Sequence, residues 1–248
     1  MRYFIGNWKM FGVPKSINIL NKINKFINSD INRKKYKVII TPPFTLLESF
    51  SKKCKNKKIK IGAQNCYHKD LFSSDTGAIS AFMIKNLGCS HLIIGHSDNR
   101  AEDDNDSVLK IKVLNALNNN LKIIFCIGEN SKQKKNNDTF KILRNQIKNI
   151  FEKKFNTSNF IIAYEPIWSI GTGKIPNSEE LQKTTEFIKK TLRDIFKNKK
   201  IPPVLYGGSV DSSNISQFKE LNEIDGFLIG GASKTAQKFV DIIKNYYR

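Results

Sequence analysis

The chain has 248 residues, with 42 Lys and Arg against 22 Asp and Glu, which gives a formal net charge of +20. A hydrophobic content of 40% excludes a disordered chain, and four cysteines in this length exclude a disulfide-stapled miniprotein. No run reaches the about 18 apolar residues of a membrane span, and the N-terminal MRYFIGNWKM lacks the pattern of a signal peptide, so we expect a soluble, cytoplasmic protein.

Short apolar runs alternate with longer amphipathic segments along the whole chain. The apolar runs predict buried strands at residues 3–7, 38–40, 59–63, 91–94, 122–126, 160–164, 204–206 and 226–229. Apolar residues at helical spacing predict a helix after each strand, at residues 17–27, 44–53, 81–87, 107–117, 140–150, 181–195, 215–221 and 236–246. Each strand–helix unit therefore spans about thirty residues, the size of a βαβ repeat.

The strands are mostly apolar, which is typical of parallel strands buried on both faces. Eight such units in 248 residues favour an α/β fold of one domain, residues 1–248, closed as an eight-stranded parallel (β/α)8 barrel. A doubly wound open sheet is the alternative. That fold usually carries G-x-G-x-x-G after its first strand, whereas this chain has GNWKMFG there.

Residues whose side chains could take part in catalysis follow several of the predicted strands. Asn7 and Lys9 end the first strand, His96 follows the fourth, and Glu165 follows the sixth. The strings GGS and GGAS follow the seventh and eighth strands, where free backbone N–H groups make an anion site. Because the active site of such a barrel lies at the carboxyl ends of its strands, we expect these groups to meet on one face.

Five strings in this order resemble the triosephosphate isomerase family, and they span nearly the whole chain: GNWKM, IIGHSDNR, AYEPIWSIGTGK, YGGSV and GFLIGGAS. The resemblance implies a TIM barrel that interconverts dihydroxyacetone phosphate and D-glyceraldehyde 3-phosphate, a step of glycolysis and gluconeogenesis, with no metal or organic cofactor. It also implies that Glu165 is the base and that His96 polarises the carbonyl as a neutral imidazole. Lys9 would stabilise the enediolate, and Asn7 would position Lys9 and the substrate.

The resemblance also implies a lid and a phosphate grip. The lid would run through Pro166, Ile167, Trp168, Gly171, Gly173 and Lys174. A backbone N–H of this glycine-containing segment, from Gly171, would reach the substrate phosphate, and the rest of the phosphate grip would come from Ser209, Gly230 and Gly231. Cys126 lies beside the predicted site without a base to activate it, so we interpret it as packing support.

Three positions depart from the family pattern. Asp98 stands where the family has Glu, one methylene shorter, as a supporting carboxylate for Lys9. Phe11 and Ala78 replace an Asn and a Glu near the family's subunit contact. The resemblance still implies a homodimer formed through the loop from Asn65 to Thr76, with a tetramer as the alternative assembly.

Several other interpretations compete with this one. An aldolase would need its Schiff-base lysine elsewhere than Lys9, and a metal-dependent epimerase would need a His/Asp ligand set at the strand ends. The charge of +20 raises nucleic acid as a partner, but the basic residues are spread over the chain without interleaved aromatics, so we expect none. His68 is expected to be exposed and His91 structural, and a plastid protein that has lost its transit peptide is the alternative location.

Overall fold

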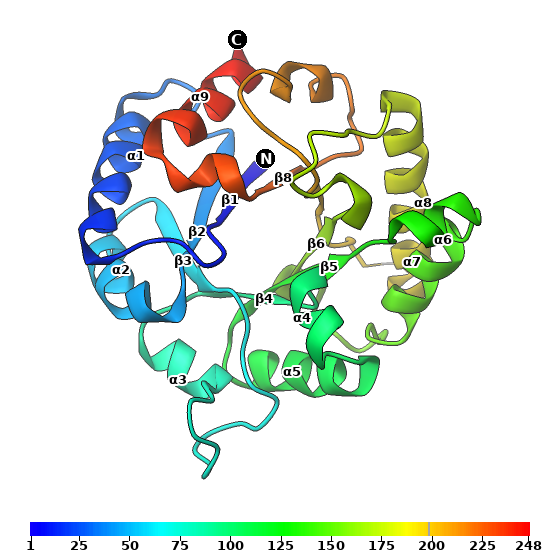
Figure 1. Ribbon diagram of the computed structural model, residues 1–248, viewed down its shortest axis with the longest axis horizontal. Helices are drawn as coiled ribbons and strands as arrows, with labels where there is room; N and C mark the ends of the chain where they lie inside the picture. Colours follow the sequence, from blue (N-terminus) through cyan, green and yellow to red (C-terminus); the bar gives the residue numbers. More distant parts are fainter. Residues whose placement is uncertain (198) are drawn as a thin grey trace.

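The computed structural model describes residues 1–197 and 199–248, and its strands form one closed parallel barrel (Figure 1). The strands are β1 (Arg2–Asn7), β2 (Tyr36–Thr41), β3 (Ile59–Ala63), β4 (His91–Ile94), β5 (Lys122–Ile127), β6 (Phe160–Tyr164), β7 (Val204–Tyr206) and β8 (Gly226–Ile229). Each strand pairs with the next in sequence, and β1 pairs with both β2 and β8. This closure excludes the open sheet.

The helices surround the barrel on its outside (Figure 1). They are α1 (Ile17–Ser29), α2 (Leu47–Cys54), α3 (Ala81–Asn86), α4 (Ser97–Glu102), α5 (Asp106–Asn118), α6 (Ser131–Lys135), α7 (Thr139–Lys148), α8 (Ser178–Phe196) and α9 (Ala236–Tyr247). Short 3₁₀ helices join some of these elements: η1 (Pro14–Ser16), η2 (Phe44–Leu46), η3 (Thr157–Asn159), η4 (Ile167–Ser169), η5 (Ile215–Phe218) and η6 (Gly231–Lys234). In the part of the chain that the structure describes, no helix is long and apolar enough to cross a membrane.

Two hydrophobic cores hold the barrel together, one on each face of the sheet. Alternate strand residues point into the barrel, where the inner core contains Ile5, Ile39, Ile93, Ile124, Cys126, Ile161, Ala163, Leu205 and Leu228. The residues between them point outward and pack against the helices in a larger outer core. Burial on both faces explains why most residues of these strands are apolar.

The predicted strands are confirmed, whereas the helical elements differ in three places. The segment 215–221 forms the 3₁₀ helix η5 in place of an α-helix, and α4 and α6 are helices that the sequence pattern does not predict. Neither α4 nor α6 contains a buried residue, so neither shows the apolar periodicity from which a helix is predicted. The unpredicted helix α4 begins directly after His96 and therefore shapes the candidate site.

Candidate active site

A cavity of about 810 Å³ opens at the carboxyl ends of the strands. Its lining includes most of the predicted site residues: Asn7, Lys9, His96, Glu165, Gly171, Gly173, Ser209, Gly230 and Gly231. The parallel topology explains this convergence, because every strand ends at the same rim of the barrel. The supporting residues Asp98 and Cys126, and the lid residues Pro166, Ile167, Trp168 and Lys174, lie outside the lining.

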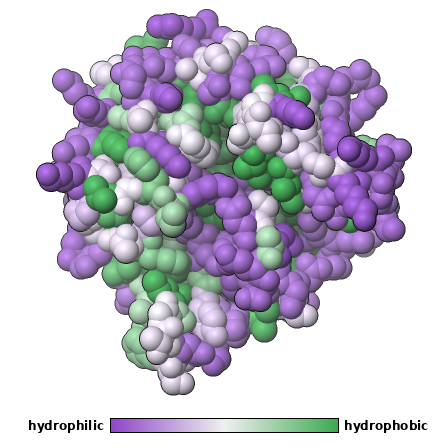
Figure 2. Space-filling model, viewed as in Figure 1, coloured by the Kyte–Doolittle hydropathy of each residue, from purple (hydrophilic) through white to green (hydrophobic). Residues whose placement is uncertain are grey.

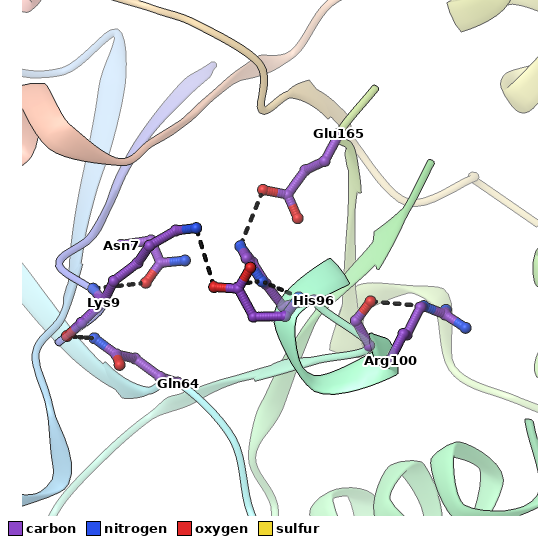
Figure 3. Close-up of polar contacts among 8 residues, drawn as sticks. Asn7, Lys9, Gln64, His96, Arg100 and Glu165 are labelled. Atoms are coloured by element: carbon purple, nitrogen blue, oxygen red, sulfur yellow. Dashed lines mark hydrogen bonds and ion pairs between the residues drawn. The ribbon is translucent and has the colours of Figure 1, made fainter. Parts of the chain in front are cut away.

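Glu165 and His96 face each other across the floor of this cavity. The Oε1 atom of Glu165 lies 3.5 Å from Nε2 of His96, and each side chain is 5% exposed (Figure 3). Among the described residues, Glu165 Oε2 and His96 Nε2 are buried polar atoms without a hydrogen-bond partner. Unpaired buried polar atoms cost free energy, so two of them beside a cavity indicate that a ligand supplies the missing partners.

The tautomer of His96 follows from its position at the start of α4. The backbone N–H of Asp98 donates to Nδ1 of His96 over 3.1 Å. An Nδ1 atom that accepts a hydrogen bond carries no hydrogen, so the ring hydrogen of a neutral His96 is on Nε2. The Nε2–H donor therefore points toward Glu165 and the cavity (Figure 3).

Lys9 is held in a strained backbone conformation just beyond β1. Its φ of 53° lies in the left-handed region, which costs a non-glycine residue about 1–3 kcal/mol. Three bonds fix it there: Asn7 Oδ1 accepts from its backbone N–H over 3.2 Å, while Gln64 Nε2 and the Phe11 N–H donate to its carbonyl over 3.0 and 2.9 Å. The expectation that Lys9 lies at the end of the first strand thus needs a correction, because β1 ends at Asn7.

Asp98 reaches Lys9 despite its shorter side chain. Its Oδ2 atom accepts from the Lys9 ammonium over 3.0 Å and lies 3.6 Å from His96 Nδ1. The Asp98 side chain is 63% exposed and that of Lys9 is 34% exposed, so water screens the pair. Exposed ion pairs are worth about 0–1 kcal/mol.

We therefore expect Asp98→Glu to change kcat/KM by less than about tenfold, since one screened ion pair supplies no more than that. The longer carboxylate keeps the charge beside Lys9, so the ammonium stays directed toward the cavity. The measurement is the steady-state rate of both proteins in the reaction that the resemblance implies. A loss beyond tenfold would show that the shorter side chain is a fitted part of the site.

Close packing around Glu165 fixes its backbone and side chain. A Cβ on Gly128 would overlap the Glu165 carbonyl oxygen, and one on Gly207 would lie 2.6 Å from Glu165 Cγ. Both glycines therefore leave the space that Glu165 occupies.

Cys126 is buried nearby, and burial, followed by the charge of Glu165, raises the pKa of its thiol well above the usual value. The thiol stays protonated, which agrees with the packing role expected for it.

A second part of the cavity wall, which we call the glycine side, is formed by glycines and hydroxyl groups. Ser209 Oγ donates to the Ser169 carbonyl over 2.7 Å and accepts the backbone N–H of Gly173 over 3.2 Å, which ties the lid segment to the end of β7. No described atom lies within 4 Å of the position of a Cβ on Gly230 or Gly231, so there is open space directly beside this backbone. That space suits a phosphate group.

Trp168 anchors the first half of the lid segment. Its indole N–H donates to Glu129 Oε1 over 2.8 Å, and the Tyr164 hydroxyl donates to Oε2 of the same carboxylate over 3.2 Å. Burial raises the pKa of Glu129. The Lys134 ammonium lies 3.5 Å from the centroid of the Trp168 ring, so the ring packs between a carboxylate at its edge and a cation over its face.

Several residues that shape the site were not predicted from the sequence. Gln64 holds the Lys9 carbonyl, and Arg100 donates to the carbonyls of Gly95 and Cys126 over 2.7 and 3.1 Å, which joins the ends of β4 and β5. Lys238 of α9 adds a cation to the glycine side of the cavity. Of these, only Gln64 carries a sequence signal, because it directly follows a predicted strand.

Two predictions outside the cavity have clear outcomes, and the structure also shows what surrounds Phe11. His68 is half-buried, with its ring 4.2 Å from that of Tyr67, so the expectation of exposure was wrong. His91 is buried with Nδ1 2.8 Å from the Ser90 hydroxyl, as expected of a structural residue. Phe11 packs with its ring edge-on to Trp8 at 5.8 Å, an apolar contact where the family pattern has a polar side chain.

Comparisons with known proteins agree with this geometry. The family model described as triosephosphate isomerase matches residues 2–246. The triosephosphate isomerase of Wolbachia pipientis wMel is 39% identical over 97% of this chain and 92% of its own length, and that of Dictyostelium discoideum is 37% identical over 98% and 95%. The crystal structure of triosephosphate isomerase from Bartonella henselae superposes with a TM-score of 0.90 at 33% identity, covering 100% of this chain and 99% of that one.

Proposed function

The chain belongs to the triosephosphate isomerase family and is an isomerase of triose phosphates, and from this premise we propose that Glu165, His96, Lys9 and Asn7 carry out the reaction. The observation that carries the assignment is the buried pair of Glu165 and His96, whose unpaired oxygen and nitrogen face the same cavity. When both groups contact the same substrate, the carboxylate can remove a proton and the neutral N–H donor can stabilise the negative charge that results.

The proton transfer begins, in the direction of aldehyde formation, with dihydroxyacetone phosphate. The Glu165 carboxylate takes a proton from C1, the electron pair left behind forms the C1=C2 bond, and negative charge develops on the C2 oxygen. His96 Nε2–H donates to that oxygen and then relays a proton from the C1 oxygen to it. Protonated Glu165 returns its proton to C2, which leaves an aldehyde at C1 and a hydroxyl group at C2. Atoms and charges balance without a redox partner.

Lys9 supplies the positive charge that the enediolate needs. Its strained backbone and its bonds to Asn7 and Gln64 set its direction before substrate arrives, so little reorganisation is required during the reaction. The substrate phosphate would lie on the glycine side, against Ser209, Gly230 and Gly231. The segment from Pro166 to Lys174 would close over it and exclude water, which protects the enediolate from loss of phosphate.

Replacing Lys9 with Met tests this electrostatic role. We expect kcat to fall by about 10²–10³-fold, because the substitution keeps the length of the side chain and removes one preorganised donor to the developing oxyanion. The measurement is a coupled isomerase assay, with thermal unfolding to show that the variant is folded. Gln64→Glu, which would weaken the grip on the Lys9 carbonyl, should lose less. A Lys9→Met enzyme within fivefold of wild type would contradict the role.

A homodimer is proposed from the surface of the loop that follows β3. This loop projects away from the barrel, and less hydrophilic side chains gather over it (Figures 1 and 2). Leu71 is 56% exposed and Phe72 is 79% exposed on the loop, while Met10, after β1, is 98% exposed. Large apolar side chains on a surface mark contact sites. Sedimentation that shows a fully active monomer would overturn this assembly, and a stable dimer would support it.

We also propose a cytoplasmic location. The four cysteines are free and buried, and thiols that fold without pairing suit a reducing compartment.

A further inference from the structure

The N-terminal mouth of the barrel, at the end opposite to the cavity, is lined by cations. Strand alternation places every second residue inside the barrel, and Ile39, Ile93 and Ile124 belong to the inner core. Two residues before each of them stand Lys37, His91 and Lys122, at or near the first residues of β2, β4 and β5. These three side chains therefore point into the mouth.

Lys60 of β3 joins the same layer. Its neighbours Ile59 and Ile61 both belong to the outer core, so Lys60 has the inward orientation. Tyr3 of β1 packs against the inner core, and the Lys37 ammonium lies 5.3 Å from the centroid of its ring. The layer thus combines one aromatic ring, one imidazole and three ammonium groups, which we call the lysine mouth: Tyr3, Lys37, Lys60, His91 and Lys122.

The three ammonium groups lack acidic partners. None of Lys37, Lys60 and Lys122 takes part in an ion pair with any residue that the structure describes. Asp225 precedes β8 at the same end, but its carboxylate accepts the Val204 N–H over 2.9 Å and lies 3.3 Å from Lys189. Its neighbour in sequence that would face inward is a glycine, Gly226.

His91 reports the combined field of these cations. The imidazole is 7% exposed, and its pKa is lowered to about 3, first by burial and then by the positive charges of Lys122, Lys37 and Lys60. Three lysines from three strands therefore act on one point inside the barrel. The three lysines are exposed, and their like charges repel one another at this end of the barrel, which costs folding free energy unless a bound anion neutralises them.

We propose that the lysine mouth binds a compact, multiply charged phosphate compound of the polyphosphate class, with the ammonium groups of Lys37, Lys60 and Lys122 as its contacts. Three positive charges at one end of the barrel match an anion that carries several charges within a short length, whereas the triose phosphates proposed for the catalytic cavity carry a single phosphate group. The ligand lies at the far end of the barrel from Glu165. It stabilises the fold by removing the repulsion among the lysines, since it binds the folded arrangement alone.

Calorimetric titration with inorganic tripolyphosphate tests the proposal, with the catalytic cavity saturated by glycerol 3-phosphate. The triple variant K37Q/K60Q/K122Q is compared with K141Q/K148Q/K190Q, which removes the same charge from exposed helix positions outside any ion pair of the described residues. We expect wild type and the second variant to bind equally, and the first to bind at least about tenfold more weakly. Tripolyphosphate should raise the Tm of wild type and leave that of the first variant unchanged.

Two results would overturn the proposal. Equal weakening in both triple variants would show that tripolyphosphate responds only to the overall charge of +20. Loss of all binding when glycerol 3-phosphate is present would place the anion in the catalytic cavity. Isomerase activity is measured on every variant as the folding control. Normal activity of K37Q/K60Q/K122Q together with lost tripolyphosphate binding separates this site from the proposed catalytic one.

Discussion

Replacing Glu165 with Gln is expected to lower kcat by about 10²–10⁴-fold while the protein stays folded, because a carboxamide of the same size cannot accept the proton of C1. The residue is 4% exposed, and Gly207 leaves room for an unbranched side chain of this length. The amide can still occupy the place of the carboxylate opposite His96. The loss should therefore appear in kcat, with a smaller change in KM.

The coupled isomerase assay on wild type and Glu165→Gln measures this loss. Glu220→Gln is the matched control, since it makes the same change at an exposed position that takes part in no ion pair among the described residues. It should keep wild-type activity. If Glu165→Gln, purified free of host isomerase, retains more than a tenth of wild-type kcat, another group acts as the base.

Gly128→Ala should produce the second large effect, a loss of about 3 kcal/mol of unfolding free energy together with most of the activity. Gly128 follows β5, where its Cβ would overlap the backbone carbonyl of Glu165. Backbone cannot rotate away as a side chain can. The Glu165 N–H is also bonded to the Ile127 carbonyl over 2.8 Å, so relieving the overlap must separate β5 from β6 and displace the base.

Urea unfolding of Gly128→Ala and Gly231→Ala measures the difference. A Cβ on Gly231 meets nothing within 4 Å, and Gly231 is the first residue of the 3₁₀ helix η6, a backbone conformation that alanine adopts, so this control should unfold like wild type. Because Gly231 lines the cavity on the side assigned to phosphate, its methyl group should raise KM. Equal stability of Gly128→Ala and wild type would contradict the close approach of Gly128 to the Glu165 carbonyl.

The strands and their order could be predicted because each one is buried on both faces and reads as an apolar run. Once eight parallel strands close, residues at strand ends such as Asn7, His96 and Glu165 must share one rim, so topology alone predicts most of the cavity. The helix α4 could not be predicted, since it buries no residue. The hydrogen bond from the Asp98 N–H that fixes the His96 tautomer depends on this helix, so it could not be predicted either.

Hydrogen bonds from side chains to distant backbone carbonyls also could not be predicted. Gln64 donates to a backbone carbonyl 55 positions away, and Arg100 donates to one 26 positions away. Neither separation follows from a periodic pattern in the sequence. The left-handed backbone of Lys9 has no sequence signal either, because Lys is not a residue that favours it. The inward-facing lysines of the barrel mouth can be identified only when it is known which residues of each strand face the interior.

The central claim is that Glu165 moves a proton through an enediolate, and NMR of dihydroxyacetone phosphate incubated with the enzyme in D2O tests it most directly. A carboxylic acid that has taken a proton from carbon can exchange it with solvent. We therefore predict that deuterium enters C1 of the substrate and C2 of glyceraldehyde 3-phosphate with wild type, and at the uncatalysed rate with Glu165→Gln. Deuterium incorporation by Glu165→Gln at the wild-type rate would contradict this mechanism, because a group other than Glu165 would then remove the C1 proton.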